Sequence, residues 1–170
     1  MTPLIRPVRA TDIPDIVVLL SRIYAAYGGV MDLAGIDAGT LRVDRWPREK
    51  GGELWIAEFD GSARATCGVT MDGDVAWLKT VYVDARLRRQ GLATRLVGEA
   101  TRFAITSGAR TMKLWSDTRF VEAHRLYRRL GFQEFGERDL HDLNNTREFG
   151  FEIELSSMTA QSGESRDRHA

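Results

Sequence analysis

The sequence predicts an α/β (α+β) fold in which helices flank a mixed, mostly antiparallel β-sheet. Runs rich in β-branched and aromatic residues alternate with turn residues over residues 54–83, which is typical of consecutive antiparallel strands. A strand, a helix and a second strand then follow one another between residues 75 and 115. This spacing predicts a right-handed crossover that joins two parallel strands. We therefore expect both kinds of strand pairing in one sheet.

The composition is that of a globular chain whose 170 residues suit one domain. Lys plus Arg and Asp plus Glu both total 24, so the chain has no basic excess and no nucleic-acid partner is expected. The N-terminus lacks the apolar run of a signal peptide, and no stretch is long and apolar enough to cross a membrane. A cytoplasmic location is expected. Cys67 is the only cysteine and lies in a run that predicts a buried strand, and no metal site is expected.

The N-terminal third begins with a predicted strand over residues 4–8 and a helix that Thr11 or Asp12 can cap. The helix has one apolar face and is expected to end near Tyr27, because Gly28 and Gly29 follow. Residues 28–52 show no clear pattern beyond a short helix over residues 38–44.

The strands that follow are separated by recognisable turns. Residues 54–58 and 63–71 flank Asp60-Gly61 and predict a hairpin, and Asp72-Gly73-Asp74 leads into a strand over residues 75–83. A helix opened by Gly91 ends at Gly108, before a strand over residues 111–115. Asp117 or Thr118 is expected to cap another helix, which Gly131 ends, and residues 132–138 and 146–155 complete the sheet. The domain is expected to span residues 1–155, with a polar, disordered tail over residues 156–170.

The junction after the strand over residues 75–83 has the features of an anion site. Gly91 opens an amphipathic helix, and the first amides of a helix have no intrahelical partner and lie at the positive end of its dipole. Arg88 and Arg89 add positive charge, although a plain basic turn is the alternative. Neither a Walker lysine nor a Gly-x-Gly-x-x-Gly pattern is present, which disfavours nucleoside triphosphates and NAD.

Two patterns together resemble a known family. Arg88-x-x-Gly91-x-Ala93 after a strand resembles the acyl-CoA pyrophosphate loop of the GNAT superfamily of acetyl-CoA-dependent N-acetyltransferases. Ala123-x-x-Leu126-Tyr127-x-x-x-Gly131-Phe132 is similar to the closing helix and next strand of that family. The resemblance covers residues 55–132 well and residues 1–54 weakly. It implies a GNAT-like sheet of six or seven strands, a central parallel pair that splays apart, and about four flanking helices.

The resemblance implies that acetyl-CoA is the cosubstrate and lies where the parallel strands separate. Its pantetheine arm would pair with the strand near Val83, where a backbone N–H would also stabilise the developing oxyanion. The loop amides would hold the pyrophosphate. The residues expected to bind the cosubstrate are Val81, Tyr82, Val83, Arg88, Arg89, Gln90, Gly91, Leu92, Ala93 and Thr94.

Tyr127 matches the tyrosine with which the family protonates the departing thiolate, so it is the expected general acid. The alternative is that Tyr127 is only a packing residue on the buried face of its helix. The general base is open, because Lys79 and Thr80 stand in the central strand where many relatives have a carboxylate. The remaining candidates, each of which can also be a solvated surface charge, are Glu53, Glu58, Asp142 and Glu148.

Further expectations concern the surroundings of the site. Ser116-Asp117-Thr118 departs from the asparagine that the family usually has near the cofactor. His124 stands among arginines and is expected to be solvated. An acceptor pocket could include the aromatic residues Tyr24, Tyr27 and Trp46.

Three functions follow from these patterns. The expected one is transfer of the acetyl group to a small-molecule primary amine by direct attack. A protein or peptide N-acetyltransferase and a non-catalytic acyl-CoA-binding module are the alternatives. The resemblance also allows a homodimer.

Overall fold

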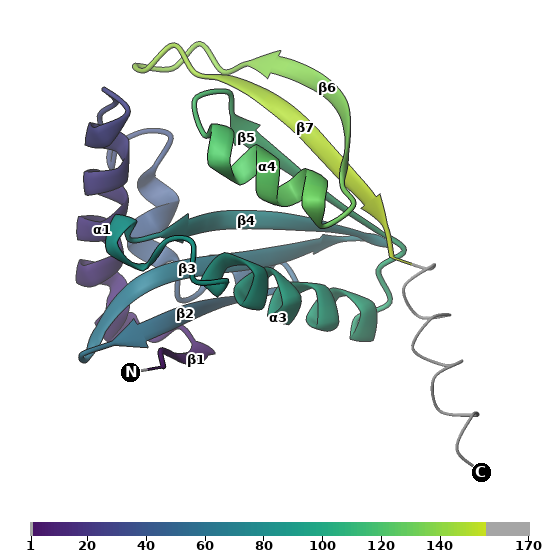
Figure 1. The fold of residues 1–170 in the computed structure, drawn as a ribbon, viewed down its shortest axis with the longest axis horizontal. Coiled ribbons are helices and arrows are strands. Elements are labelled where there is room, and N and C mark those ends of the chain that lie inside the picture. Colours follow the sequence, from purple (N-terminus) through teal and green to yellow (C-terminus); the bar gives the residue numbers. More distant parts are fainter. Residues whose placement is uncertain (1, 156–170) are drawn as a thin grey trace.

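The computed structural model describes residues 2–155, so the tail expected over residues 156–170 lies outside the described residues. Seven strands form one sheet in the order β1-β2-β3-β4-β5-β7-β6 (Figure 1). Neighbouring strands are antiparallel except β4 and β5, which are parallel. The predicted mixed sheet is therefore confirmed. The strands are β1 (Leu4–Pro7), β2 (Glu53–Phe59), β3 (Ser62–Asp72), β4 (Val75–Val83), β5 (Thr111–Asp117), β6 (Gln133–Asp139) and β7 (Arg147–Glu154).

Helices cover both faces of the sheet. Within the described residues these are α1 (Ile13–Ala26), α2 (Trp46–Glu49), α3 (Leu92–Thr106) and α4 (Val121–Arg129), with 3-10 turns η1 (Ala10–Asp12), η2 (Ala38–Arg42) and η3 (Ala85–Leu87). Strand alternation divides the core into two clusters: Trp55 and Ala57 of β2 pack on the α3 side, whereas Leu54 and Ile56 pack on the α1 side. In Figure 1, α3 and α4 lie on the near face of the sheet, and α1 stands beside it.

The central parallel pair separates soon after it forms. β4 and β5 pair only over three residues each, where Val75, Ala76 and Trp77 face Thr111, Met112 and Lys113. Beyond Trp77 the edge of β4 that faces β5 has no strand partner in the described chain. Figure 1 shows the two strands diverging from this point.

β4 also carries a bulge in this separated part. On β3, one residue lies between the paired residues Thr66 and Gly68, but on β4 two residues lie between their partners Tyr82 and Lys79. The extra residue falls where Thr80 adopts a left-handed φ of 53°, and the Thr66 hydroxyl donates a hydrogen bond to the Thr80 carbonyl at 2.7 Å. A bulge bends a strand and changes which way its side chains point. Here it leaves Lys79 and Tyr82 on the α1 face and Val81 on the α3 face.

Two helix starts differ from expectation. Asp12 precedes α1 but does not cap it, because its buried carboxylate is paired with Arg6 at 2.8 Å and accepts the Arg9 N–H at 2.7 Å. Asp117 is the last residue of β5, and it accepts the backbone N–H of Arg119, so α4 begins only at Val121. In both cases an arginine side chain, Arg6 or Arg119, forms an ion pair with the carboxylate, which is therefore not available to the first amides of the helix.

The short helix expected over residues 38–44 is also wrong in its extent. A 3-10 turn, η2, ends at Arg42, and the separate helix α2 begins at Trp46. Pro47 stands in the first turn of α2, where its missing N–H costs nothing.

Candidate functional site

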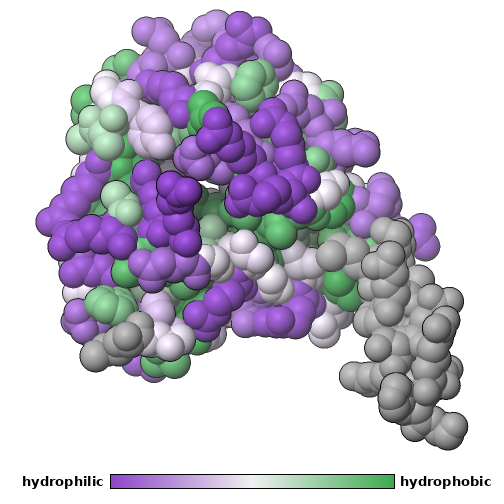
Figure 2. Space-filling model, in the orientation of Figure 1, coloured by the Kyte–Doolittle hydropathy of each residue, from purple (hydrophilic) through white to green (hydrophobic). Residues whose placement is uncertain are grey.

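A cavity of about 370 Å³ lies where β4 and β5 separate. Leu78, Leu114 and Tyr127 in its lining belong to the core on the α3 side, whereas Tyr24 and Tyr82 belong to the α1 side. The cavity therefore reaches both faces of the sheet. Seen from the α3 and α4 side, the surface is hollowed near its centre, and apolar side chains show between hydrophilic rims (Figure 2).

Tyr127 occupies the position that its motif predicts, on α4 and in the wall of this cavity. Its side chain is buried, and its ring packs against Phe132 and Phe151 with centroids 5.8 and 5.6 Å apart. The hydroxyl has no hydrogen-bond partner within residues 2–155. Burial raises the pKa of Tyr127, so the phenol stays protonated at neutral pH.

The loop between β4 and α3 has the geometry of an anion site. Gly91 is the N-cap of α3 with φ 73°, and Arg89 adopts φ 61°. Within the described residues, the backbone N–H groups of residues 88–94 donate to no protein acceptor, so they are available to a ligand. Arg88 turns back, and its Nε donates to the Val83 carbonyl at 3.2 Å. The Leu92 side chain is buried in the core, so Leu92 can contact a ligand only through its backbone amide.

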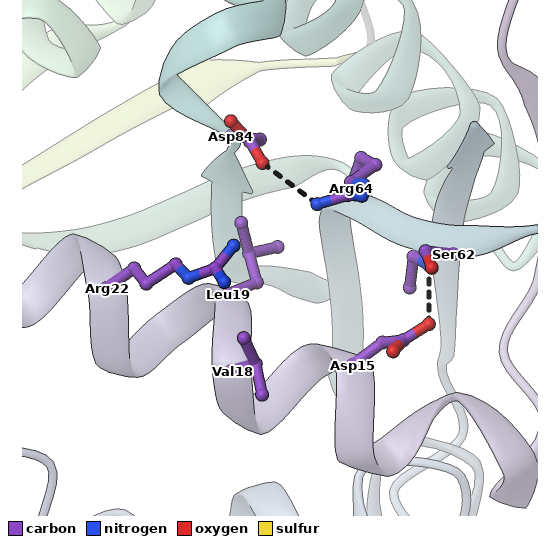
Figure 3. Close-up of a pocket in the computed structure, with 8 residues that line it drawn as sticks. Asp15, Val18, Leu19, Arg22, Ser62, Arg64 and Asp84 are labelled. Carbon is purple, nitrogen blue, oxygen red and sulfur yellow. Dashed lines mark hydrogen bonds and ion pairs between the residues drawn. The ribbon is translucent and has the colours of Figure 1, made fainter. Parts of the chain in front are cut away.

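Asp84 fixes the start of this loop. Its Oδ1 accepts the Arg86 N–H at 3.0 Å, and its Oδ2 lies 3.4 Å from Arg64. Figure 3 shows this ion pair beside a second cavity of about 190 Å³, toward which Asp15 and Arg22 extend from α1. None of the residues around this second cavity lines the larger one, so the two cavities are separate.

The α1 side of the larger cavity is aromatic. The Tyr24 and Tyr82 hydroxyl oxygens lie 3.4 Å apart, and the Tyr24 hydroxyl also donates to Asp37 Oδ1 at 3.1 Å. Tyr27 packs edge-on against Phe120 at 4.8 Å. Burial raises the pKa of Tyr82 to about 12, so this hydroxyl is neutral at physiological pH.

The four carboxylates considered as bases separate into two pairs. Glu148 and Asp142 line the cavity, whereas Glu53 and Glu58 do not. Glu58 is paired with Arg6 at 2.7 Å and Glu53 with Arg48 at 2.9 Å, both remote from the separated strands. Of the aromatic residues considered for the acceptor pocket, Tyr24 and Tyr27 line this cavity, and Trp46 lines a neighbouring groove.

The expectation that His124 is solvated is wrong. It is buried on the inner face of α4, three residues before Tyr127, and its Nε2 lies 3.1 Å from the Ser116 hydroxyl. Its ring lies against Phe149 and Phe151. Burial lowers the pKa of His124. The i, i+3 spacing to Tyr127 is the sequence signal that places both on one helix face.

A contact between two distant loops lies at the edge of the cavity, and the sequence gives no sign of it. The Asn144 side chain, between β6 and β7, accepts the Val30 N–H at 2.9 Å and donates to the Val30 carbonyl at 2.8 Å. Nearby, Asp142 accepts the backbone N–H and the hydroxyl of Thr146, both at 2.7 Å. Arg119 pairs with Asp117 at 2.6 Å at the cavity wall.

No helix between residues 2 and 155 is long and apolar enough to cross a membrane. Over the same residues, no three or more His, Cys, Asp or Glu side chains are grouped so that they could hold a metal ion.

A parallel pair that opens onto a cavity, with a loop of free amides and a helix after its first strand, is the arrangement that the resemblance to the GNAT superfamily implies. The family model described as Acetyltransferase (GNAT) family matches residues 24–132, and the chain belongs to this family. An uncharacterized N-acetyltransferase of Methanocaldococcus jannaschii is 34% identical over 61 residues, which are 36% of this chain and 27% of that relative. The chain therefore matches only about a quarter of that relative's length.

Solved structures share the fold at low sequence identity. A GNAT-family acetyltransferase from Staphylococcus aureus Mu50 has a TM-score of 0.79 and 17% identity over 90% of this chain and 99% of that chain. An acetyltransferase from Streptococcus agalactiae 2603 has a TM-score of 0.75 and 16% identity over 88% and 98%. A candidate acetyltransferase from Salmonella typhimurium, solved with its cofactor acetyl-CoA, has a TM-score of 0.73 and 15% identity over 91% and 95%.

Proposed function

We propose that this protein is an N-acetyltransferase that transfers the acetyl group of acetyl-CoA to the primary amine of a small molecule. Membership of the GNAT family supports both the reaction and the cosubstrate. The similar fold of the Salmonella protein with acetyl-CoA agrees with this. The observation that carries the proposal is that the open edge of β4, the loop amides before α3 and Tyr127 all belong to one end of the separated strand pair.

Residues 1–155 form the acetyltransferase domain in this proposal, and acetyl-CoA enters from the α3 side. Its pantetheine arm pairs with β4 near Val81, Tyr82 and Val83, because this edge has no strand partner there. Its pyrophosphate accepts hydrogen bonds from the amides of residues 88–94, at the positive end of α3. The positive charges of Arg88 and Arg89 add attraction.

The amine attacks the thioester carbonyl directly. The new C–N bond forms as the carbonyl electron pair moves to oxygen, where a backbone N–H near Val83 stabilises the charge. Collapse of this intermediate breaks the C–S bond, and the Tyr127 hydroxyl donates its proton to the departing sulfur. Because burial keeps Tyr127 protonated, the donor is present at neutral pH. The attacking amine loses its proton to Glu148 or Asp142, the two candidate carboxylates in the cavity lining.

A loop contact at the edge of the cavity favours a small acceptor over a peptide. Asn144 joins its loop to Val30 across the acceptor side, and a protein substrate needs an open groove there. The volume of about 370 Å³ falls in the range of small-molecule sites.

The test is to incubate the protein with acetyl-CoA and a panel of primary amines, and to measure thiol release and product mass. Release with small amines, lost in Tyr127→Phe, supports the proposal. Tight acetyl-CoA binding without release for any amine would instead indicate a non-catalytic acyl-CoA-binding module. A steep preference for lysine peptides would indicate a protein acetyltransferase.

A further inference from the structure

A groove of about 480 Å³ adjoins the cavity on the sheet face opposite α3. Lys79, Trp115 and Arg138 line both hollows, so the groove continues from the cavity at these residues. The nine residues around the groove are Trp46, Lys50, Thr70, Met71, Asp72, Trp77, Lys79, Trp115 and Arg138. A molecule that enters the cavity by its amine can therefore extend its other end along the sheet.

Positive charge dominates this groove. Lys50, Lys79 and Arg138 face a single acidic lining residue, Asp72. Arg138 is already paired with Glu148 at 2.6 Å, whereas neither Lys50 nor Lys79 has a carboxylate within ion-pair distance in the described chain. Lys79 is half-buried beside the bulge of β4, and its Nζ lies 5.5 Å from the Trp77 ring centroid.

The environment of Lys79 disfavours its charge. Its burial, reinforced by the charges of Arg138 and Lys50 and only partly opposed by the charge of Glu148, lowers the pKa of the Lys79 ammonium. A half-buried cation in this state is stabilised when an anion binds beside it, because the pair then offsets the cost of desolvation.

The walls of the groove are flat and aromatic. Three of the four tryptophans of the chain, Trp46, Trp77 and Trp115, line it, and the fourth lies in the core under α3. The Arg138 guanidinium lies over the Trp115 ring, 4.4 Å from its centroid. Such walls bind an apolar or aromatic group by contact and by stacking.

We propose that this groove binds the distal part of the acceptor, and that the acceptor is an amine with a carboxylate or other anionic group beside an apolar or aromatic part. The anion lies beside Lys79, with Lys50 farther along the groove, and the amine points into the cavity toward Glu148. The inference rests on the proposed function, since it names the acceptor class of the same site.

Binding of non-reactive probes tests the anion site without any turnover. Phenylacetate and phenylacetamide have similar shape, differ in charge and carry no amine to acetylate. By calorimetric titration, we expect phenylacetate to bind about tenfold more tightly, as a charge-assisted contact implies. Lys79→Gln is expected to abolish this difference and Lys79→Arg to retain it.

Lys113→Gln is the matched control. Lys113 lies on the same sheet face but lines neither hollow, and it is paired with Glu152 at 2.9 Å. The Lys113→Gln variant should keep the preference for phenylacetate. Equal binding of the two probes by the wild type, or loss of the preference in Lys113→Gln, would overturn the anion site.

Kinetics link the site to the acceptor. We expect kcat/KM for phenylalanine to exceed that for phenethylamine by about tenfold in the wild type, and the ratio to approach one in Lys79→Gln. A higher kcat/KM for phenethylamine would contradict the acceptor class. Thiol release with neither amine nor any other, alongside an intact preference for phenylacetate, would refute the proposed function but support the anion site.

Discussion

The Thr66 hydroxyl donates a hydrogen bond of 2.7 Å to the carbonyl of Thr80, the residue with positive φ in the β4 bulge. Thr66 is fully buried, so this bond satisfies a carbonyl that the bulge removes from the regular ladder. We expect Thr66→Val, which keeps the shape of the side chain, to lower the free energy of unfolding by about 1–3 kcal/mol. Chemical denaturation measures this.

Thr106→Val is the control for that substitution. The Thr106 hydroxyl also donates to a backbone carbonyl, that of Arg102 at 2.9 Å, but at an exposed position on α3. Its loss should cost little because water replaces it. Equal destabilisation by the two substitutions would mean that the bulge does not depend on Thr66.

Removal of the Tyr127 hydroxyl should slow the chemical step without weakening acetyl-CoA binding. Tyr127→Phe should lower kcat on the order of 100-fold, the usual share of a general acid. Acetyl-CoA affinity and unfolding free energy should not change, because the hydroxyl has no hydrogen-bond partner in the described chain. Tyr27→Phe, which removes another hydroxyl from the cavity lining, should leave kcat within a few-fold of wild type. A Tyr127→Phe enzyme with wild-type kcat would rule out the acid role.

His124 should make stability depend on pH. Burial lowers its pKa in the folded protein below the ordinary 6.5, so the unfolded chain binds the proton more strongly. The stabilising contribution of neutral His124 is present above pH 6.5 and is lost as the pH falls through the lower folded pKa. Urea unfolding of wild type and His124→Gln on both sides of this window measures it. Gln stays neutral and should flatten the dependence.

The exposed His141 provides the comparison for this pH effect. It adopts φ 51°, which asparagine tolerates, so His141→Asn should keep the backbone and the wild-type pH dependence. If His141→Asn flattened the curve and His124→Gln did not, His124 would not be the group responsible.

Asn144 should control the acceptor side alone. Asn144→Ala removes both hydrogen bonds to Val30, and we expect the acceptor KM to rise a few-fold while the Kd of acetyl-CoA stays constant. Leu143→Ala changes an exposed neighbour in the same loop and should alter neither. A parallel loss of acetyl-CoA affinity in Asn144→Ala would show that the loop contact supports the whole domain instead.

Local patterns predicted most of the fold. The Asp60-Gly61 hairpin, the turn at Gly73 and the parallel pair joined by α3 depend on short-range preferences that the sequence carries. The errors arose where tertiary contacts override local signals. Asp12 forms an ion pair with Arg6 instead of capping a helix, and His124 faces the core although arginines flank it in the sequence.

The geometry of the candidate site was predictable only in the part that motifs describe. Gly91 and Tyr127 stand in patterns with fixed spacing, so their places follow from the sequence. Asn144 and Val30 are 114 residues apart, and the groove around Lys79 forms from α2, β3, β4, β5 and β6. No periodicity within one segment can indicate such contacts between distant parts of the chain.

The most direct test of the account is calorimetric titration of acetyl-CoA into the wild type, Gly91→Glu and Gly73→Glu. Both glycines have positive φ and open space at the Cβ position, but only Gly91 begins α3 at the loop that we assign to the pyrophosphate. We predict that the wild type and Gly73→Glu bind acetyl-CoA and that Gly91→Glu does not, because its carboxylate would repel the phosphates. Absence of binding by the folded wild type, or undiminished binding by Gly91→Glu, would contradict it.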